Sequence, residues 1–267
     1  MRFRMLGSLE IHDGDDFVVI RGHNQQRLLR LLAINANDAV PVPALVDAVW
    51  ATGRPSDPVH ALHTMVTGAR QHIAACRASN GETARIDHLG WAYRLSINTD
   101  EIDTVCFEHL VATGRELIAA QEAAAASAVL SEALGLWRGP ALGEVASEFA
   151  FQAEAVRLEN LRLAALELRI DTELGLGRHA ELVGGLEALV SAHPTDEGLC
   201  GRLMVALYRS GRQVEALRRY RDLASQLAEQ LGIDPTPALQ DVEQAILEQR
   251  AALDDPTVSV GKASHRH

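Results

Sequence analysis

Residues Asp57–Cys76, DPVHALHTMVTGARQHIAAC, decide the fold of the first third of the chain. Asp57 followed by Pro58 is a helix start signal, because an acidic residue caps free amide groups and proline fits the first helical position. Apolar residues then recur at helical spacing and predict one buried face: Leu62, Met65, Val66, Ala69, Ile73 and Cys76. The opposite face carries side chains that can donate hydrogen bonds: His60, His63, Thr64, Thr67, Arg70, Gln71 and Arg77.

A shorter helical pattern precedes this stretch, over Pro43–Trp50, and the polar turn Ala51–Ser56 joins the two. Two helices around a short turn, with donors exposed on the second, are typical of a helix-turn-helix that reads DNA. Taken alone, the pattern more often belongs to a helix pair that only builds a core. The flanking sequence decides between the two interpretations.

The flanking segments predict strands on one side and a hairpin on the other. Residues 1–20 alternate apolar and polar side chains around the turn Asp13-Gly14, and a first helix follows over Gln25–Ala36 with Arg27 and Arg30 on its outer face. After a break at Ser79–Gly81, a second hairpin is predicted around Leu89-Gly90, from strands Ala84–His88 and Trp91–Leu95. This is the element order of a winged helix with an N-terminal sheet. The hairpin would be the wing, with Arg85, His88 and Arg94 facing DNA.

From Asn98 onward the sequence predicts helices only, and we place a domain boundary between residues 97 and 98. The predicted helices cover Asp103–Ala119, Glu122–Trp137, Phe149–Gly175, His179–His193, Asp196–Arg209, Val214–Leu231 and Pro237–Ala252. A repeat is visible because Gly177-Arg178-His179-Ala180-Glu181 recurs 34 residues later as Gly211-Arg212-Gln213-Val214-Glu215, the tetratricopeptide period. We expect residues 98–252 to form an array of helical hairpins and residues 253–267 a disordered tail.

Charge is unevenly distributed along the chain. The net charge is −11, which by itself argues against a nucleic-acid partner. Residues 1–97, however, hold ten Arg against nine Asp and Glu, whereas residues 98–267 hold fifteen basic against twenty-seven acidic side chains. We therefore expect DNA to bind the first third of the chain, and a different partner to meet the acidic remainder.

Segments for export or membrane insertion are absent from the sequence. No apolar run reaches membrane-spanning length and the N-terminus lacks the apolar core of a signal peptide, so we expect a cytoplasmic protein without a membrane partner. Cys76, Cys106 and Cys200 lie far apart among apolar helical positions. They are interpreted as reduced thiols of the core, not as a disulfide or zinc framework.

The sequence contains no catalytic constellation. The motifs GxSxG, HExxH and the P-loop do not occur. His60 and His63 lie three residues apart on one helical face, but no carboxylate or cysteine at a fitting offset completes a metal site. Trp137, just before Gly139-Pro140, is interpreted as a core residue at a helix end. We expect no enzymatic activity, no metal and no cofactor.

Blocks of sequence in both halves resemble one family. In the first half they are Arg4-Met5-Leu6-Gly7, Leu9-Glu10-Ile11, Gln26-Arg27-Leu28-Leu29, Ala44–Trp50, and Gly90 with Tyr93-Arg94-Leu95. In the second half they are Ala133–Leu142, Glu159 with Leu161-Arg162-Leu163, Gly177-Arg178-His179, His193-Pro194, Leu207–Gln213, Glu215-Ala216-Leu217 and Leu231–Pro235. With these blocks in this order, the chain resembles the Streptomyces antibiotic regulatory proteins from Met1 to about Gln249.

The resemblance implies a mainly α fold: an OmpR-type winged helix-turn-helix of α+β class, followed by an all-α, tetratricopeptide-like bacterial transcriptional activation domain. It implies a sequence-specific transcriptional activator of a secondary-metabolite gene cluster. Such proteins bind direct repeats in double-stranded DNA at promoters, together with a second protomer, and recruit RNA polymerase holoenzyme. Residues 1–97 are then expected to bind DNA unaided, though weakly, and the helical domain to supply activation.

The DNA-reading helix departs from the family pattern. Gly68 and Gln71 stand where the family usually has basic residues, and Asn24-Gln25 stand before Gln26-Arg27 where a lysine is common. Each lost phosphate contact lowers the affinity for DNA and its dependence on salt. The thin basic face leaves open a second interpretation, in which the helical array is a protein- or ligand-binding sensor and the winged helix has lost affinity for DNA.

Overall fold

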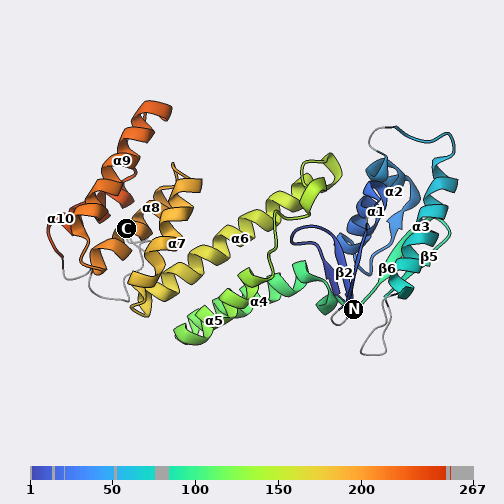
Figure 1. Cartoon of the computed structure of the whole chain (residues 1–267), viewed down its shortest axis with the longest axis horizontal. Helices are drawn as coiled ribbons and strands as arrows, with labels where there is room; N and C mark the ends of the chain where they lie inside the picture. The colour runs from blue at the N-terminus through green and yellow to red at the C-terminus, as the bar shows by residue number, and fades with distance from the viewer. Residues whose placement is uncertain are drawn as a thin grey trace. The chain divides into compact units, whose positions relative to one another are not determined.

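The computed structural model describes residues 2–13, 16–20, 22–50, 53–75, 84–250 and 253. Over these residues the chain is mainly helical, with two small sheets in its first hundred residues (Figure 1). The predicted fold class is confirmed. Gly14, Cys76, Arg77, the break at Ser79–Gly81 and the tail after Leu253 lie outside the described residues. Leu253, the first residue of the predicted tail, is buried.

The N-terminal segment folds into an antiparallel meander, as its alternation predicts. Its three strands are β1 (Arg2–Arg4), β2 (Glu10–Asp13) and β3 (Asp16–Val19). Phe3 pairs with Ile11, and Ile11 with Val18. Residues paired across neighbouring strands lie on the same face of the sheet, and Phe3 and Ile11 are both fully buried on that face.

Three helices and a second sheet complete the winged-helix segment. The helices are α1 (His23–Ile34), α2 (Val42–Val49) and α3 (Pro58–Ala75), and the strands are β4 (Val40–Pro41), β5 (Arg85–His88) and β6 (Ala92–Ser96). The sheet has the order β4-β6-β5, with α3 against β5 and α1 against β6 (Figure 1). The β5–β6 hairpin turns at Gly90, whose φ of +80° suits glycine. The two-residue strand β4 was not predicted.

Helices α1 and α3 approach each other closely at Gly68. A Cβ atom at this position would lie 3.2 Å from Nε2 of Gln25 on α1. Glycine in a helix costs about 1 kcal/mol relative to alanine. Because Nε2 is the far end of a flexible side chain, a small shift of Gln25 would accommodate alanine, and this contact does not explain the glycine.

The compact units of the chain do not follow the predicted boundary after residue 97. One unit comprises residues 1–112 with 132–163, and the other comprises residues 113–131 with 164–267. Helices α4 (Asp103–Ala119), α5 (Ala123–Gly135) and α6 (Phe149–Gly175) each contribute residues to both. Residues 1–97 thus belong to a larger packed unit. Whether they form a domain of their own stays a prediction.

Asp103 joins the N-terminal sheet to α4 inside the first unit. Its carboxylate accepts hydrogen bonds from the backbone N–H groups of Met5, at 2.7 Å, and Leu6, at 3.0 Å. Nη2 of Arg138 lies 3.6 Å from the same carboxylate. Burial raises the pKa of Asp103 above its ordinary value, and the two N–H groups and Arg138 offset part of that rise.

The segment 138–143 makes further contacts with residues 5–7. The backbone N–H groups of Arg138 and Leu142 donate to the carbonyl oxygens of Leu6 and Met5, both at 2.9 Å. A Cβ atom at Gly7, whose φ is +132°, would lie 3.2 Å from Cβ of Arg138. The predicted core residue Trp137 is confirmed as buried. Phe107 packs edge-on against it at 5.2 Å between ring centroids, and the Arg162 guanidinium lies 4.5 Å from the centre of the Trp137 ring.

The second unit contains the predicted helical hairpins. Beside parts of α4, α5 and α6 it holds α7 (His179–Ala192), α8 (Glu197–Arg209), α9 (Gln213–Leu231) and α10 (Pro237–Leu247). Gly177 and Gly211 have nearly the same left-handed φ, 78° and 77°. The residue after each glycine donates its N–H to a carbonyl five residues back, Arg178 to Glu173 and Arg212 to Leu207. Both repeats therefore end a helix with the same hydrogen-bonding pattern.

A buried ion pair and a buried thiol lie in the core of the second unit. Arg202 donates to both carboxylate oxygens of Asp171, at 2.8 and 3.0 Å. Cys200 is 1% exposed, and burial raises the pKa of its thiol to about 12. Cys106 is partly exposed and donates to the carbonyl oxygen of Asp100. Over the described residues, no helix has the length and apolar composition needed to cross a membrane.

Candidate nucleic-acid interface

Helix α3 has the two faces that its sequence predicts. The Asp57 carboxylate caps it by accepting the N–H of His60 at 3.0 Å. Leu62, Val66, Ala69 and Ile73 are buried, and Met65 is half-buried. The predicted DNA-facing side chains that the structure describes on this helix are all exposed: His60, His63, Thr64, Thr67, Arg70 and Gln71. Arg77 lies outside the described residues.

Two exposed threonines on this face have hydroxyl groups that donate within the helix. The hydroxyl of Thr64 donates to the carbonyl of His60 at 3.2 Å, and that of Thr67 donates to His63 at 3.0 Å. A hydroxyl oxygen that donates within the helix still offers lone pairs to a base edge. Both threonines can therefore accept a hydrogen bond from a base without rotating.

Arg70 connects the reading helix to the wing. Its Nε and Nη2 atoms donate to the carbonyl oxygen of Ile86 in β5, at 3.0 and 2.7 Å. One edge of the guanidinium is thus engaged within the protein. The predicted contact between Arg70 and guanine has to use the other edge, or has to break this link.

Three rings strengthen the junction between α3 and the wing. The His88 ring stacks on Tyr93 with 4.8 Å between ring centroids, and the His63 ring meets both edge-on, at 5.8 and 6.1 Å. His63 and His88 are exposed, whereas Tyr93 is 3% exposed. The buried Tyr93 ring therefore contacts both histidines that the sequence predicts to face DNA.

The wing holds an acidic residue among its predicted DNA contacts. Asp87 accepts from Nε of Arg85 at 3.0 Å, from Nη2 of Arg94 at 3.3 Å and from the Ser96 hydroxyl at 2.7 Å. The Ser96 hydrogen bond, followed by the two guanidinium groups, holds the pKa of Asp87 below its ordinary value. Arg85 and Arg94, which the sequence predicts to face DNA, are thus both paired with a carboxylate on the same hairpin.

Replacing Asp87 with asparagine is expected to strengthen DNA binding. Asparagine still accepts the Ser96 hydrogen bond but releases Arg85 and Arg94 and removes the negative charge beside them. Each arginine that gains a phosphate should steepen the slope of log affinity against log salt by about 0.9. Binding of promoter DNA at several salt concentrations measures this. Asp47→Asn, which breaks the exposed pair with Arg54, is the matched control. A slope unchanged by Asp87→Asn would remove both arginines from the phosphate contacts.

The wing tip carries exposed apolar residues that the sequence interpretation missed. Trp91 is 63% exposed and Leu89 is 38% exposed, on either side of Gly90. The sequence predicts that Trp91 begins a strand, but β6 begins at Ala92 and Trp91 belongs to the turn. Its position beside Gly90 could have indicated this, since a turn directs side chains to solvent.

Arg27 does not lie on an open surface. Its guanidinium is engaged with Glu148 and with the end of α2, and its side chain is 14% exposed. The structure brings together the predicted residues of α3 and the wing and holds Arg27 apart, in contacts within the protein. Its predicted role in DNA binding stays a prediction.

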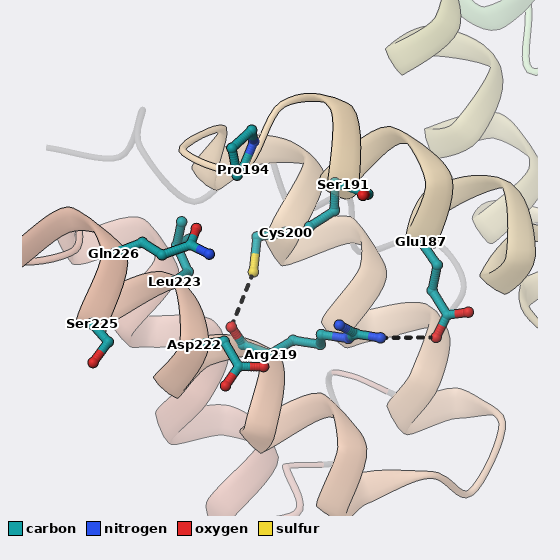
Figure 2. A pocket seen from close by; sticks show the side chains of 10 residues that line it. Glu187, Ser191, Pro194, Cys200, Arg219, Asp222, Leu223, Ser225 and Gln226 are labelled. Carbon is teal, nitrogen blue, oxygen red and sulfur yellow. Dashed lines mark hydrogen bonds and ion pairs between the residues drawn. The ribbon is translucent and has the colours of Figure 1, made fainter. Parts of the chain in front are cut away.

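A separate pocket lies in the second unit, between α7, α8 and α9 (Figure 2). Its volume is about 450 Å³. Figure 2 shows the Cys200 thiol directed at the Arg219 carbonyl oxygen and the Arg219 guanidinium directed at Glu187, 3.2 Å away. Polar side chains dominate its wall, including Ser191, Ser225 and Gln226. Among the described residues, no three His, Cys, Asp or Glu side chains are grouped so that they could hold a metal ion.

Comparison with known proteins agrees with this arrangement. Residues 102–247 match the family described as the bacterial transcriptional activator domain. The regulatory protein DnrI of Streptomyces peucetius is 35% identical over 257 residues, which are 95% of this chain and 94% of that protein. The regulatory protein AfsR of Streptomyces griseus is 34% identical over 92% of this chain, which spans only 24% of that longer protein.

A solved structure shows the same fold. Mycobacterium tuberculosis EmbR, solved in complex with a low affinity phosphopeptide, matches with a TM-score of 0.85 and 31% identity. The match covers 96% of this chain and 68% of that one. The winged helix, the helical repeats and these relatives agree with the family that the sequence blocks indicate. The chain belongs to the Streptomyces antibiotic regulatory proteins, a family of transcriptional activators that carry the bacterial transcriptional activator domain.

Proposed function

We propose that this activator binds direct repeats in promoter DNA through α3 and the β5–β6 wing, beside a second protomer. Its helical repeats would then recruit RNA polymerase holoenzyme to a secondary-metabolite gene cluster. The observation that carries the proposal is the donor-rich face of α3, exposed and joined to the wing through Arg70 and Tyr93. A helix that offers hydrogen-bonding side chains next to a hairpin with arginines fits a major groove and the adjoining backbone.

The acidic helical region supports a division of labour. Residues 98–267 hold fifteen basic and twenty-seven acidic side chains, so they repel phosphates. Stacked helical hairpins offer extended surfaces that suit protein partners. We therefore assign DNA reading to α3 and the wing, and contacts with the polymerase and the second protomer to the helical region.

The test combines footprinting with transcription in vitro. The intact chain is expected to protect two adjacent repeats in a promoter that flanks its own gene, and to raise transcription by holoenzyme from it. Thr64→Val and Thr67→Val keep the shape of α3 and remove only the two hydroxyls. They should reduce discrimination between bases by about 0.5–1.5 kcal/mol each if the hydroxyls read bases. A uniform loss across sequences would assign them to the backbone. Absence of protection on every flanking promoter would contradict DNA reading.

The pocket between α7, α8 and α9 favours a second candidate function, that of a ligand sensor. Its polar wall and volume of about 450 Å³ are compatible with a small polar molecule. Under this alternative the helical region binds a ligand and the winged helix contributes no sequence-specific affinity. The footprint separates the two functions, since only the activator protects DNA without an added ligand.

A further inference from the structure

Arg27 on α1 is held by three different parts of the first unit. Its Nε and Nη2 atoms donate to the two carboxylate oxygens of Glu148, at 2.7 and 2.9 Å. Its Nη1 atom donates to the side chain of Asn24, at 2.8 Å, and to the carbonyl oxygen of Val49, at 3.1 Å. Val49 is the last residue of α2. One guanidinium therefore connects α1, the end of α2 and residue 148.

Glu148 is itself held in place by contacts with α6 and α1. Its carbonyl oxygen accepts the N–H groups of Phe151 and Gln152, both at 2.9 Å, so it stands at the start of the long helix α6. Its carboxylate also lies 3.1 Å from Nε2 of His23, the first residue of α1. Held by its helix on one side and by two residues of α1 on the other, the Glu148 carboxylate has little freedom to move.

Neighbouring contacts bring α1 close to the same segment. The sequence places Arg30, one helical turn after Arg27, on the outer face of the helix, but Arg30 is fully buried and donates to Gln26 at 2.9 Å. A Cβ atom at Gly143 would lie 3.2 Å from Nη2 of Arg30 and 2.8 Å from the carbonyl oxygen of Gly7. Gly143 therefore packs against Arg30 and Gly7 without room for a larger residue.

These contacts conflict with a direct role for Arg27 at a DNA phosphate. To reach a phosphate, the guanidinium would have to leave Glu148, Asn24 and Val49 together. The Glu148 side chain, 18% exposed, would then lose its bidentate partner and keep its charge beside His23. A bidentate arginine–carboxylate pair sheltered from solvent is also screened less by salt than an exposed pair. Arg27 is therefore better suited to hold α2 than to bind DNA.

We propose that Arg27 and Glu148 are a positioning pair, through which the start of α6 fixes the end of α2 and so the angle at which α3 meets DNA. This inference rests on the proposed DNA binding. It makes Glu148, which lies in the activator-domain region and far along the chain from α3, a determinant of DNA affinity. It also gives the activator domain a direct mechanical connection to the helix-turn-helix.

The test uses the intact chain with Arg27→Gln, Glu148→Gln and both changes together. Each single change is expected to weaken binding to duplex DNA of the flanking promoters by about tenfold, which corresponds to about 1.4 kcal/mol. The slope against log salt should stay unchanged, because no phosphate contact is lost. The double variant should bind no more weakly than the weaker single variant, since the pair is already broken. Arg27→Lys should bind with intermediate affinity.

Two controls separate positioning from general damage to the fold. Glu154→Gln removes a carboxylate from the same part of α6, where it pairs with Arg157, and should leave DNA binding unchanged. All affinities are measured at a temperature where circular dichroism shows each variant folded. Hydrogen exchange of the amides of residues 42–49 should be faster in both single variants and unchanged in Glu154→Gln.

Three outcomes would overturn the inference. A salt slope about one unit shallower in Arg27→Gln, with tighter binding in Glu148→Gln, would make Arg27 a phosphate contact that Glu148 restrains. Wild-type affinity in both single variants would show that the pair does not position α3. If the intact chain binds none of the promoters, DNA reading itself fails, and hydrogen exchange alone decides: unchanged exchange in residues 42–49 would exclude positioning, and faster exchange would support it.

Discussion

A chain that ends after Asn98 is expected not to fold cooperatively and to lose at least a hundredfold in affinity for DNA, about 2.7 kcal/mol or more. This replaces the sequence-based expectation that residues 1–97 bind DNA unaided. The fragment lacks the Asp103 carboxylate, and the N–H groups of Met5 and Leu6 lose their buried acceptor. It also lacks Ile102, which pairs with Phe3, and Glu148, the partner of Arg27.

The size of this effect follows from what the missing residues satisfy. Each hydrogen bond lost contributes about 0.5–1.5 kcal/mol, or about 1.5–3 kcal/mol where a charged group takes part, as it does in the bonds to Asp103 and Glu148. Together these losses reach the roughly 5–15 kcal/mol by which whole domains are stable. The truncated fragment is therefore expected to be unfolded at 25 °C.

Fluorescence offers a selective measurement of this unit. All three tryptophans of the chain, Trp50, Trp91 and Trp137, lie in the first unit. Urea unfolding followed by tryptophan emission should show no transition for the fragment ending at Asn98. A fragment ending at Leu163 retains every partner named above and should unfold cooperatively. A fragment of residues 1–98 that unfolds cooperatively and binds promoter DNA like the intact chain would restore the original boundary.

The local structure of the chain was largely predictable from its sequence. The bounds of α4 and α6 agree with the predicted helices to the residue, because Asp103 and Phe149 begin, and Ala119 and Gly175 end, clear helical periodicities. The repeat around Gly177 and Gly211 also appears in the backbone, with matching φ angles. Such features depend on neighbours a few residues away, which the sequence displays directly.

Pairings between distant residues were not predictable in the same way. The two-residue strand β4 forms only because β6, some fifty residues later, lies beside it. The division into units was also hidden, because Asp103 and Glu148 resemble ordinary surface carboxylates in a helical sequence. Periodicity shows which face of an element is apolar, but it does not show which distant residues the element will contact.

The candidate site shows the same distinction. The exposed and buried faces of α3 follow from its spacing, and the structure agrees for every described residue except the half-buried Met65. The engagement of Arg70 by Ile86, and of Arg85 and Arg94 by Asp87, depends on how strands and helix meet. Sequence reasoning named these arginines as DNA contacts; it left open that Arg94 pairs with a carboxylate inside the domain, but it did not show which carboxylate. Their availability to DNA depends on internal acceptors that compete with phosphates.

Substitution of Asp103 by alanine is expected to destabilise the first unit by about 2–6 kcal/mol, because two buried N–H groups lose their acceptor at a cost of about 1–3 kcal/mol each. The side chain of Asp103 is 6% exposed, and its carboxylate satisfies the N–H groups of Met5 and Leu6. Alanine leaves both groups without an acceptor in a site that water does not reach. Arg138 keeps a carboxylate partner, because Glu10 lies 3.0 Å from its Nη1 atom. The main loss is therefore the backbone acceptor.

Asparagine at position 103 tests whether the shape of the side chain is enough. Its amide oxygen can accept one of the two N–H groups, while its amide nitrogen faces the other as a second donor. The loss for Asp103→Asn should therefore be close to that for alanine, although asparagine has nearly the same shape as aspartate. If shape alone mattered, Asp103→Asn would be nearly as stable as the unchanged chain and clearly more stable than Asp103→Ala.

Urea unfolding read by tryptophan emission measures both variants, since the emission comes from the first unit alone. Asp100→Ala is the matched control, because its side chain is 70% exposed and lies 3.8 Å from Nδ1 of His109. It should change stability by no more than about 0.5 kcal/mol. A shift of similar size for Asp103→Ala would show that the N-terminal sheet is held without its carboxylate. In that case the hydrogen bonds from residues 5 and 6 to Asp103 would not explain why residues 1–97 need the rest of the unit.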